Sequence, residues 1–266
     1  LKQTRDTFWL DRKGRPELVP IGLRPLDRLL GGLTPGTCGI LGLATGVGKS
    51  SAMLFAALES SVPVGIVSLE DTPDMVGARI MSYYTGVDSL RLRTKDVTRE
   101  ELEAVRNVDP PTHVSFAYPL AGSIVEVEDA IGALTERGAK MIWVDYLQEI
   151  RGHKDDRRNE VAEALSRCHR AAAKGGAALM MLSQFHRLQD PNKPPQIWNL
   201  AESSDLEKKA RIIVLGWQTP DPEGQVRIRF ALRKSNYGGA GLKFDMTRDA
   251  SGTLRPAKYY DVTEDF

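Results

Sequence analysis

The sequence has few cysteines, no long apolar run and almost no net charge, and each absence narrows the possible functions. Its two cysteines, Cys38 and Cys168, stand far apart, with no CxxC pair and no histidine at ligand spacing, so we expect no zinc site. We expect both thiols to be buried in the reducing environment of the cytoplasm. No apolar run reaches the roughly 18 residues that span a bilayer, and no secretory signal opens the sequence. No membrane partner is therefore expected.

The charge balance also limits the kind of partner. With 36 Lys and Arg against 35 Asp and Glu, the net charge is +1, so a polyanion has to bind to a local basic patch. The 266 residues suffice for one large α/β domain, and 41% hydrophobic and 27% charged residues are ordinary for a globular protein. The first residue is Leu rather than Met, which suggests a piece of a longer protein.

The chain divides into a polar arm and one large domain. Residues 1–20 are mostly polar and charged, and we interpret them as an N-terminal arm or linker. Within them, Phe8-Trp9-Leu10 is expected to pack either on an adjacent subunit or on the chain's own core. Residues 21–266 are expected to form one domain, because no repeat, low-complexity tract or second linker interrupts them.

Apolar runs that predict buried strands alternate with segments that predict helices. The expected strands are Cys38–Leu43, Val64–Leu69, Val114–Phe116, Met141–Val144, Ala177–Leu182 and Ile212–Trp217. The expected helices are a short one within Ile21–Leu33, then Ser50–Ser60, Thr72–Thr85, one beginning at Arg99–Val105, Ser123–Arg137 and Asn159–Lys174. Near the end, Val226–Leu232 and Leu242–Met246 flank a Gly-rich loop and predict a β-hairpin. The order predicts an α/β fold with a mostly parallel sheet, helices on both faces and a C-terminal hairpin.

A Gly-rich turn, Gly46-Val47-Gly48-Lys49-Ser50, lies between a predicted strand and a predicted helix. Backbone N–H groups in such a turn, together with the positive end of the helix, form a cradle for phosphate. In this context Lys49 reaches the β- and γ-phosphates and Ser50 ligates Mg²⁺. The full P-loop pattern would place a further glycine at position 43, which is Leu43 here. We therefore expect Mg²⁺-ATP to bind to the following residues: Thr45, Gly46, Val47, Gly48, Lys49, Ser50 and Ser51.

Three further strand ends carry polar residues: Glu70, Asp145 and Gln184. The carboxyl ends of parallel strands meet at one edge of the sheet, where ligands bind. Asp145 is expected to hold Mg²⁺ together with Ser50, and Glu70 to orient or deprotonate the attacking water. Gln184 is expected to sense the γ-phosphate through a hydrogen bond. Each residue alone would be an ordinary capping or solvated group, but together with the Gly-rich turn they predict an ATPase.

These residues resemble the C-terminal motor domain of the DnaB-like replicative helicases, a branch of the RecA-fold ATPases. The resemblance extends from Ile21 to about Met246, and Val144-Asp145-Tyr146-Leu147-Gln148 is its most specific match. The other matching segments are Ile21-Gly22-Leu23-Arg24-Pro25-Leu26-Asp27, Val67-Ser68-Leu69-Glu70, Leu182-Ser183-Gln184-Phe185-His186-Arg187, Leu200-Ala201-Glu202-Ser203-Ser204-Asp205-Leu206-Glu207 and Arg233-Lys234-Ser235-Asn236-Tyr237-Gly238.

The resemblance implies a RecA-like P-loop fold and a homo-oligomeric ring, usually a hexamer, with ATP bound between subunits. It also implies single-stranded DNA in a central channel and replication partners such as a primase or a loader. The family's hairpin usually offers a Lys and an Arg to the neighbouring nucleotide, and the expected Arg position is Asn236 here. Arg233 or Lys234 is therefore expected to reach across the interface. Ala201 also replaces an Arg of the family pattern, and the family's N-terminal primase-binding domain is not in this sequence.

Two basic segments follow strands whose carboxyl ends would face the ring axis. The first contains Arg151, Lys154, Arg157 and Arg158, and the second runs from Arg187 to Asn199 and contains Lys193. Their charges could neutralise DNA phosphates without regard to base sequence. Composition alone allows solvated surface loops equally well, and the resemblance favours DNA binding.

The leading hypothesis is an ATP-driven, ring-forming DNA helicase motor that translocates on single-stranded DNA. A second hypothesis keeps the fold and makes the protein a RecA-like recombination or repair ATPase. A third makes it a nucleotide-dependent DNA-binding or loading module with weak catalysis, which the Asn236 departure keeps open.

Overall fold

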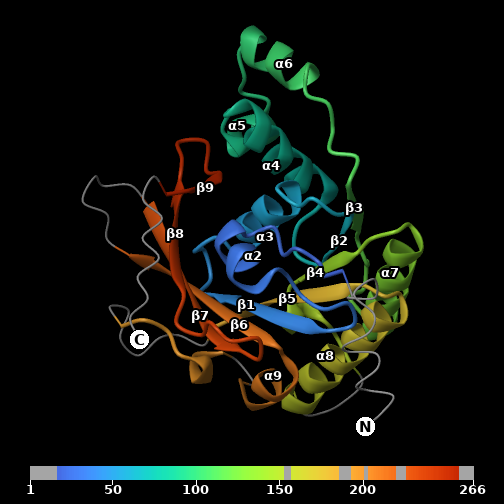
Figure 1. Ribbon diagram of the computed structural model, residues 1–266. Coiled ribbons are helices and arrows are strands. Elements are labelled where there is room, and N and C mark those ends of the chain that lie inside the picture. Colours follow the sequence, from blue (N-terminus) through green and yellow to red (C-terminus); the bar gives the residue numbers. More distant parts are fainter. Residues whose placement is uncertain (1–16, 153–156, 186–192, 201–202, 220–225, 258–266) are drawn as a thin grey trace.

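A twisted nine-stranded sheet forms the centre of the part of the chain that the structure describes (Figure 1). The computed structural model describes residues 17–152, 157–185, 193–200, 203–219 and 226–257. The strand order is β3-β2-β4-β5-β1-β6-β7-β8-β9. The strands are β1 Cys38–Leu43, β2 Val64–Ser68, β3 Val114–Ala117, β4 Met141–Asp145, β5 Ala178–Gln184, β6 Ile212–Thr219, β7 Val226–Ser235, β8 Lys243–Arg248 and β9 Leu254–Pro256.

The first six strands in the chain run parallel, and β7, β8 and β9 extend the sheet in antiparallel fashion from β6. The helices are α2 Arg24–Leu30, α3 Lys49–Leu58, α4 Pro73–Thr85, α5 Ser89–Thr94, α6 Arg99–Arg106, α7 Ile124–Glu136, α8 Arg157–Lys174 and α9 Ser203–Lys209, with short 3₁₀ turns at Leu147–Glu149 and Ile197–Asn199. The predicted mostly parallel sheet and its terminal hairpin are confirmed.

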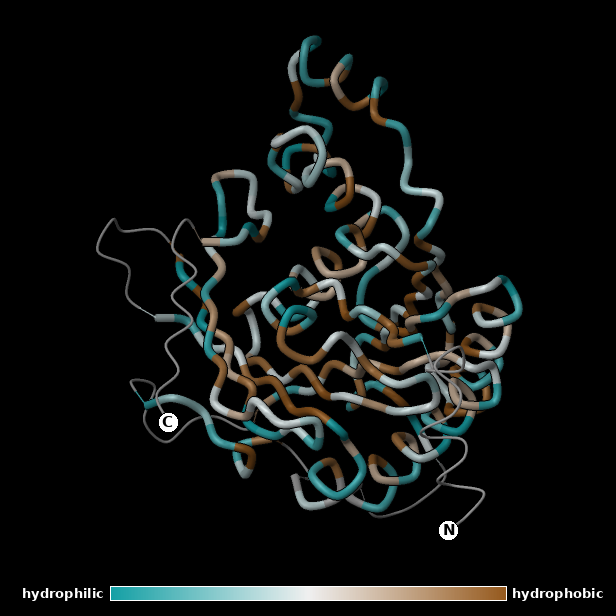
Figure 2. The backbone as a smooth tube through the Cα atoms, viewed as in Figure 1, coloured by the Kyte–Doolittle hydropathy of each residue, from teal (hydrophilic) through white to brown (hydrophobic). Residues whose placement is uncertain are grey.

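Helices cover both faces of the sheet, so its central strands are apolar along their whole length (Figure 2). One core lies between the sheet and the α2–α4 side and takes Leu41 and Leu43 of β1. The other lies on the α7–α8 side and takes Cys38 and Ile40 of the same strand. This alternation explains why six buried residues in a row predict a strand at β1. Both cysteines are free and buried, as expected.

The segment that leads into β1 is fixed against α3 by an aspartate and a glycine. The Asp27 carboxylate accepts hydrogen bonds from the Ile21 and Gly22 N–H groups at 2.7 and 2.9 Å. Gly22 has φ +88°, and a Cβ added to it would lie 1.9 Å from the Ala56 carbonyl oxygen of α3. A side chain at Gly22 would therefore push this segment away from the helix that begins the phosphate site. Core packing begins before this point, since Val19 is buried and pairs with Leu33.

Several elements differ from the expectations drawn from sequence. The short helices α5 and α9 and the strand β9 were not anticipated, and β7 continues three residues beyond the predicted Leu232, to Ser235. The helix α8 begins at Arg157, inside the segment predicted as the first channel loop. Helices α4, α5 and α6 form a projection above the sheet (Figure 1). No helix in the described ranges is both long enough and apolar enough to span a bilayer.

Candidate active site

The turn between β1 and α3 has the backbone geometry of a phosphate cradle. Gly46 and Gly48 have φ values of +75° and +119°, in the left-handed region that favours glycine. Gly48 is the N-cap of α3, and Lys49 is its first residue. The unpaired N–H groups at this helix start and the helix dipole both favour an anion here. The first part of the predicted nucleotide site is therefore folded as its pattern requires.

Lys49 is held by groups that come from two other strand ends. Its side chain is only 8% exposed, and its ammonium lies 3.9 Å from a Glu70 carboxylate oxygen. The same ammonium sits 4.4 Å from the centroid of the Tyr146 ring. Both contacts fix the position of the ammonium at this edge of the sheet. The structure thus brings Lys49, Glu70 and the segment after β4 together, although they are far apart in sequence.

Asp145 is the most unusual ionisable group of the site. It is fully buried at the end of β4, and neither carboxylate oxygen has a hydrogen-bond partner among the described residues. Burial raises its pKa to about 6, while the neighbouring Ser50 hydroxyl and the Lys49 ammonium act in the opposite direction. A buried carboxylate without a partner is costly unless a cation compensates it. Carboxylate and hydroxyl oxygens are the ligands that Mg²⁺ prefers, so Asp145 and Ser50 fit this ion.

Gln184 and Glu70 lie on either side of this arrangement. The Gln184 side-chain amide donates a hydrogen bond to the Thr45 hydroxyl in the phosphate cradle. Gln148 accepts from the Gln184 backbone N–H at 3.2 Å and donates to the Ser183 hydroxyl at 3.0 Å. Glu70 is half exposed, so solvent water reaches its carboxylate. The predicted set Thr45, Lys49, Ser50, Glu70, Asp145 and Gln184 therefore converges on one edge of the sheet.

Two arginines that the sequence analysis missed also belong to this edge. Arg79 of α4 pairs with the buried Asp71 at 2.7 Å, directly after Glu70 in the chain. Arg248, at the end of β8, donates to the Val47 carbonyl in the phosphate cradle at 3.0 Å. A Cβ on Gly48 would lie 2.7 Å from the same Arg248 guanidinium. No motif marks these residues. The contact between Arg248 and Val47 joins segments that are distant in the sequence, whereas Asp71 and Arg79 are close neighbours, one just before α4 and one within it.

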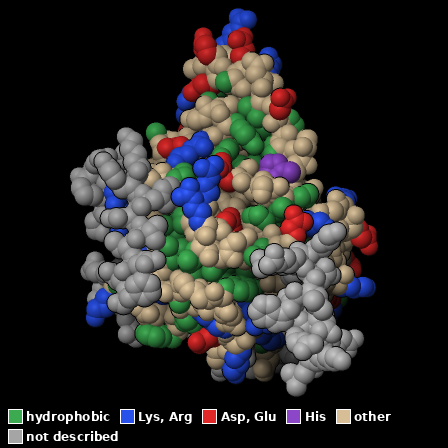
Figure 3. Space-filling view, viewed as in Figure 1, with side chains coloured by type: hydrophobic (Ala, Val, Ile, Leu, Met, Phe, Trp, Pro, Cys, Tyr) green, Lys and Arg blue, Asp and Glu red, His purple; other side chains and the backbone are tan. Residues whose placement is uncertain are grey.

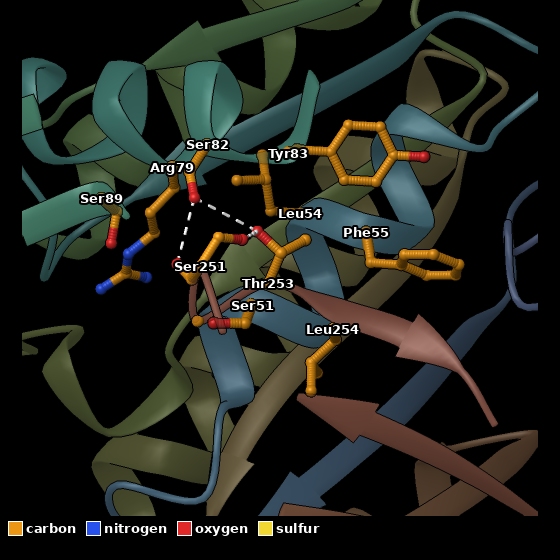
Figure 4. A pocket seen from close by; sticks show the side chains of 11 residues that line it. Ser51, Leu54, Phe55, Arg79, Ser82, Tyr83, Ser89, Ser251, Thr253 and Leu254 are labelled. Atoms are coloured by element: carbon orange, nitrogen blue, oxygen red, sulfur yellow. Dashed lines mark hydrogen bonds between the residues drawn. The ribbon is translucent and has the colours of Figure 1, made fainter. Parts of the chain in front are cut away.

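A pocket adjoins the cradle where α3, α4 and the turn before β9 meet (Figure 4). Ser51 and Leu254 line it, and Leu254 also packs near Gly48. The Ser82 hydroxyl donates to the Ser251 carbonyl at 3.1 Å and shares a 3.3 Å hydrogen bond with the Thr253 hydroxyl, which ties α4 to this turn. In Figure 3, Lys and Arg side chains gather over β9, beside the α4–α6 projection. Its lining mixes the apolar side chains of Leu54, Phe55 and Leu254 with the hydroxyls of Ser51, Ser82 and Thr253.

Arg233 and Lys234, predicted to act on a neighbour, lie away from this edge. The Lys234 ammonium donates to the Glu207 carbonyl and, at 2.8 Å, to the Ala210 carbonyl at the end of α9. The Arg233 guanidinium lies 5.6 Å from the Trp217 ring centroid, and burial lowers its pKa. Neither side chain reaches the cradle of its own chain.

The predicted DNA-binding residues are only partly within the described ranges. Arg151 has an exposed side chain, and its backbone is fixed by hydrogen bonds to Gly122 and Ile124 at 2.9 and 3.0 Å. Lys193 is exposed as well. The backbone of Arg157 and Arg158 forms the first turn of α8. The remaining positions of interest lie outside the described residues: Lys154, Arg187, Ala201 and the arm up to residue 16.

Comparison with known proteins extends this picture. The family model for the DnaB-like helicase C-terminal domain matches residues 19–230. A probable plasmid replicative DNA helicase of Chlamydia trachomatis serovar L2 is 26% identical over 225 residues, covering 80% of this chain and 50% of the relative. The chain thus spans about half the length of this curated relative.

Two solved structures share the fold. A DnaB-like replicative helicase, described together with its interactions with primase, superposes with a TM-score of 0.76 at 18% identity, covering 95% of this chain and 64% of that one. The RadB recombinase superposes with a TM-score of 0.55 at 18% identity, covering 91% of this chain and 100% of that one. Both likenesses confirm the predicted RecA-like fold.

Proposed function

Because the chain belongs to the DnaB-like helicase C-terminal domain family, we propose that it is the ATP-hydrolysing motor of a ring-forming helicase that translocates on single-stranded DNA. The observation that carries the proposal is Asp145. A buried carboxylate without a hydrogen-bond partner destabilises the fold. Beside Ser50 and Lys49, the same carboxylate is suited to bind a metal ion that carries a triphosphate.

In the proposed reaction each group at the sheet edge has a distinct role. The N–H groups of the cradle and Lys49 bind the β- and γ-phosphates, and Ser50 and Asp145 hold Mg²⁺, which would neutralise developing negative charge. Glu70 orients the attacking water. The water oxygen bonds to the γ-phosphorus, the bond to the β–γ bridging oxygen breaks, and ADP leaves with that electron pair. Glu70 accepts the proton of the water.

Gln184 couples the γ-phosphate to the rest of the molecule in this proposal. Its amide contacts Thr45 in the cradle, and its chain continues directly into the second predicted DNA-binding segment. Loss of the γ-phosphate would change the hydrogen bonds of this amide at the carboxyl end of β5. The exposed Arg151 and Lys193 would contact DNA phosphates, together with Lys154, Arg157, Arg158 and Arg187. A ring, usually a hexamer, and a primase or loader are the partners that we propose.

The first test is ATP turnover with and without oligo-dT, for the chain as it stands and for Lys49→Ala. We expect DNA-stimulated hydrolysis that Lys49→Ala abolishes, because the variant loses the cation on the β- and γ-phosphates. Arg137→Ala, an exposed change at the end of α7, is the control and should retain full activity. Retained DNA-stimulated turnover in Lys49→Ala would exclude this active site.

Two rival functions have their own readouts. A forked-duplex assay separates a helicase from a RecA-like recombination or repair ATPase, which would hydrolyse ATP on DNA without unwinding. Magnesium-dependent ATP binding without measurable turnover would instead favour a DNA-binding or loading module.

A further inference from the structure

Within one chain the active site has few cations for a transition state. Lys49 is the cation at the predicted β- and γ-phosphate position. The Arg79 guanidinium is paired with Asp71, and Arg248 is hydrogen-bonded to the cradle backbone. Phosphoryl transfer gains much of its rate from an additional arginine beside the γ-phosphate, which a neighbouring molecule can supply. The question is therefore which cation a second copy of this chain would present.

The end of the sheet opposite the cradle carries an arginine in a suitable position. Arg211 immediately precedes β6, and its N–H donates to the Cys38 carbonyl at 2.7 Å, at the start of β1. Five residues of β1 separate this level from Leu43, a distance of about 17 Å at ~3.3 Å per residue. Arg211 therefore cannot serve the phosphate cradle of its own chain. A contact between this end of one copy and the cradle of the next joins two different surfaces, and such head-to-tail interfaces generate rings or filaments.

Arg211 also stands beside the position where the hairpin lacks an arginine. The Asn236 N–H donates to the Arg211 carbonyl at 2.9 Å, next to the register pair Ile212 and Ser235. Residues opposite one another on antiparallel strands project to the same face with Cβ atoms about 5 Å apart. The side chains of Arg211 and Asn236 thus start side by side on the same face, so the Arg211 guanidinium can reach the region that a longer side chain at position 236 would reach.

The two cations of the hairpin itself are engaged elsewhere. Lys234 caps the carbonyl end of α9, and turning it toward a neighbour would leave the Ala210 carbonyl without this donor. Arg233 is half-buried over Trp217. By contrast, the Arg211 side chain is exposed and makes no side-chain hydrogen bond or ion pair within the described residues. A change in the direction of the Arg211 side chain would therefore break no side-chain hydrogen bond or ion pair among the described residues.

We propose that Arg211 of one copy enters the active site of the next and donates hydrogen bonds to the γ-phosphate oxygens during hydrolysis. This inference rests on the proposed ATPase function and names the residue that completes its site. A second copy of the chain fits this site by charge, because its exposed Arg211 would lie beside a triphosphate and the half-exposed Glu70. The guanidinium stabilises negative charge as the water oxygen bonds to the γ-phosphorus and the bridging oxygen leaves with ADP.

The first experiment compares Arg211→Ala, Arg211→Lys and Lys208→Ala. Arg211→Ala should lower kcat on the order of 10³-fold while leaving Mg²⁺-ATP affinity within a few-fold, because the cradle is intact. Arg211→Lys should recover only part of the rate, since an ammonium cannot donate in the same planar fashion. Lys208→Ala removes an exposed charge from the last turn of α9, three positions before Arg211, and should retain its rate. An unchanged kcat in Arg211→Ala would overturn the inference.

The second experiment shows whether Arg211 acts between copies. Lys49→Ala lacks the cradle cation but keeps Arg211, and Arg211→Ala has the opposite defect. Mixed together, the two inactive variants should regain hydrolysis at roughly one interface in four, where an intact cradle meets an intact arginine. Inactive mixtures would overturn the inference, as would loss of activity in Lys234→Ala or Arg233→Ala with full activity in Arg211→Ala. Failure of the unmodified chain to bind or hydrolyse Mg²⁺-ATP would instead refute the proposed function.

Discussion

At the scale of single residues, Asp145 lowers the stability of the metal-free protein and is proposed to bind Mg²⁺. Its carboxyl has an ordinary pKa of 3.8 and a folded-state pKa of about 6, raised by burial. The folded state therefore binds this proton more tightly than the unfolded chain does. The contribution of Asp145 to the free energy of unfolding falls as pH rises from about 4 to 6, and the loss persists above pH 6.

Asp145→Asn should consequently stabilise the metal-free protein. The difference between 3.8 and about 6 corresponds to a gain on the order of 3 kcal/mol at pH 8, and to little gain at pH 4. Urea unfolding at both pH values measures this difference. The same variant should lose magnesium-dependent ATP binding, so higher stability and lost binding should occur together. Equal stability of the two proteins at pH 8 would contradict the burial argument.

Individual residues also show what the sequence can indicate. The convergence of Lys49, Ser50, Glu70, Asp145 and Gln184 on one edge could be predicted, because each stands at or after the end of an apolar strand and parallel strand ends meet there, while their roles stay a proposal. Arg248 could not be predicted, because its contact with Val47 joins segments whose approach only the folded sheet determines. The Asp71–Arg79 pair is local to α4, but no motif or periodicity marks it. Arg211 carried no local signal either, since its role follows from its place next to Asn236.

At the scale of elements, the loop before α2 and the helix α3 are locked together by the close approach of Gly22. Gly22→Ala should destabilise the protein by about 3 kcal/mol or more, because its φ is +88° and its Cβ would meet the Ala56 carbonyl at 1.9 Å. Gly132→Ala is the matched control, since a Cβ at this site in α7 meets nothing within 4 Å. The control should gain about 0.5–1 kcal/mol from helix propensity. Chemical denaturation of both variants tests the pair.

The elements that sequence analysis missed share a physical property. The helices α5 and α9 have six and seven residues, and β9 has three. Such short pieces carry too few positions to show a periodicity, and tertiary contacts stabilise them. The start of α8 was predicted two residues late, at Asn159, because the charged residues before it indicated a loop. Long buried strands, in contrast, are visible in the sequence.

At the scale of the whole molecule, the proposal places DNA along the edge where β4 and β5 end. Arg151→Ala should weaken oligo-dT binding and should reduce the slope of log affinity against log salt by about 0.7, the value for one phosphate contact on a single strand. The backbone of Arg151 is pinned by Gly122 and Ile124, so the change should leave the fold intact. Arg137→Ala has the same charge change away from this edge and should leave the slope unchanged. Fluorescence anisotropy over a salt series measures both.

Because Arg211 lies far from the phosphate cradle of its own chain, the proposed hydrolysis requires two copies in contact. A lone copy would bind ATP at one end of its sheet and carry Arg211 at the other end. Dilution should therefore abolish hydrolysis without unfolding the protein. We expect the rate per molecule to climb with protein concentration and then level off, with a lag after rapid dilution or mixing while copies re-engage. A rate per molecule that is constant down to nanomolar protein, where light scattering detects only monomers, would show that each copy works alone.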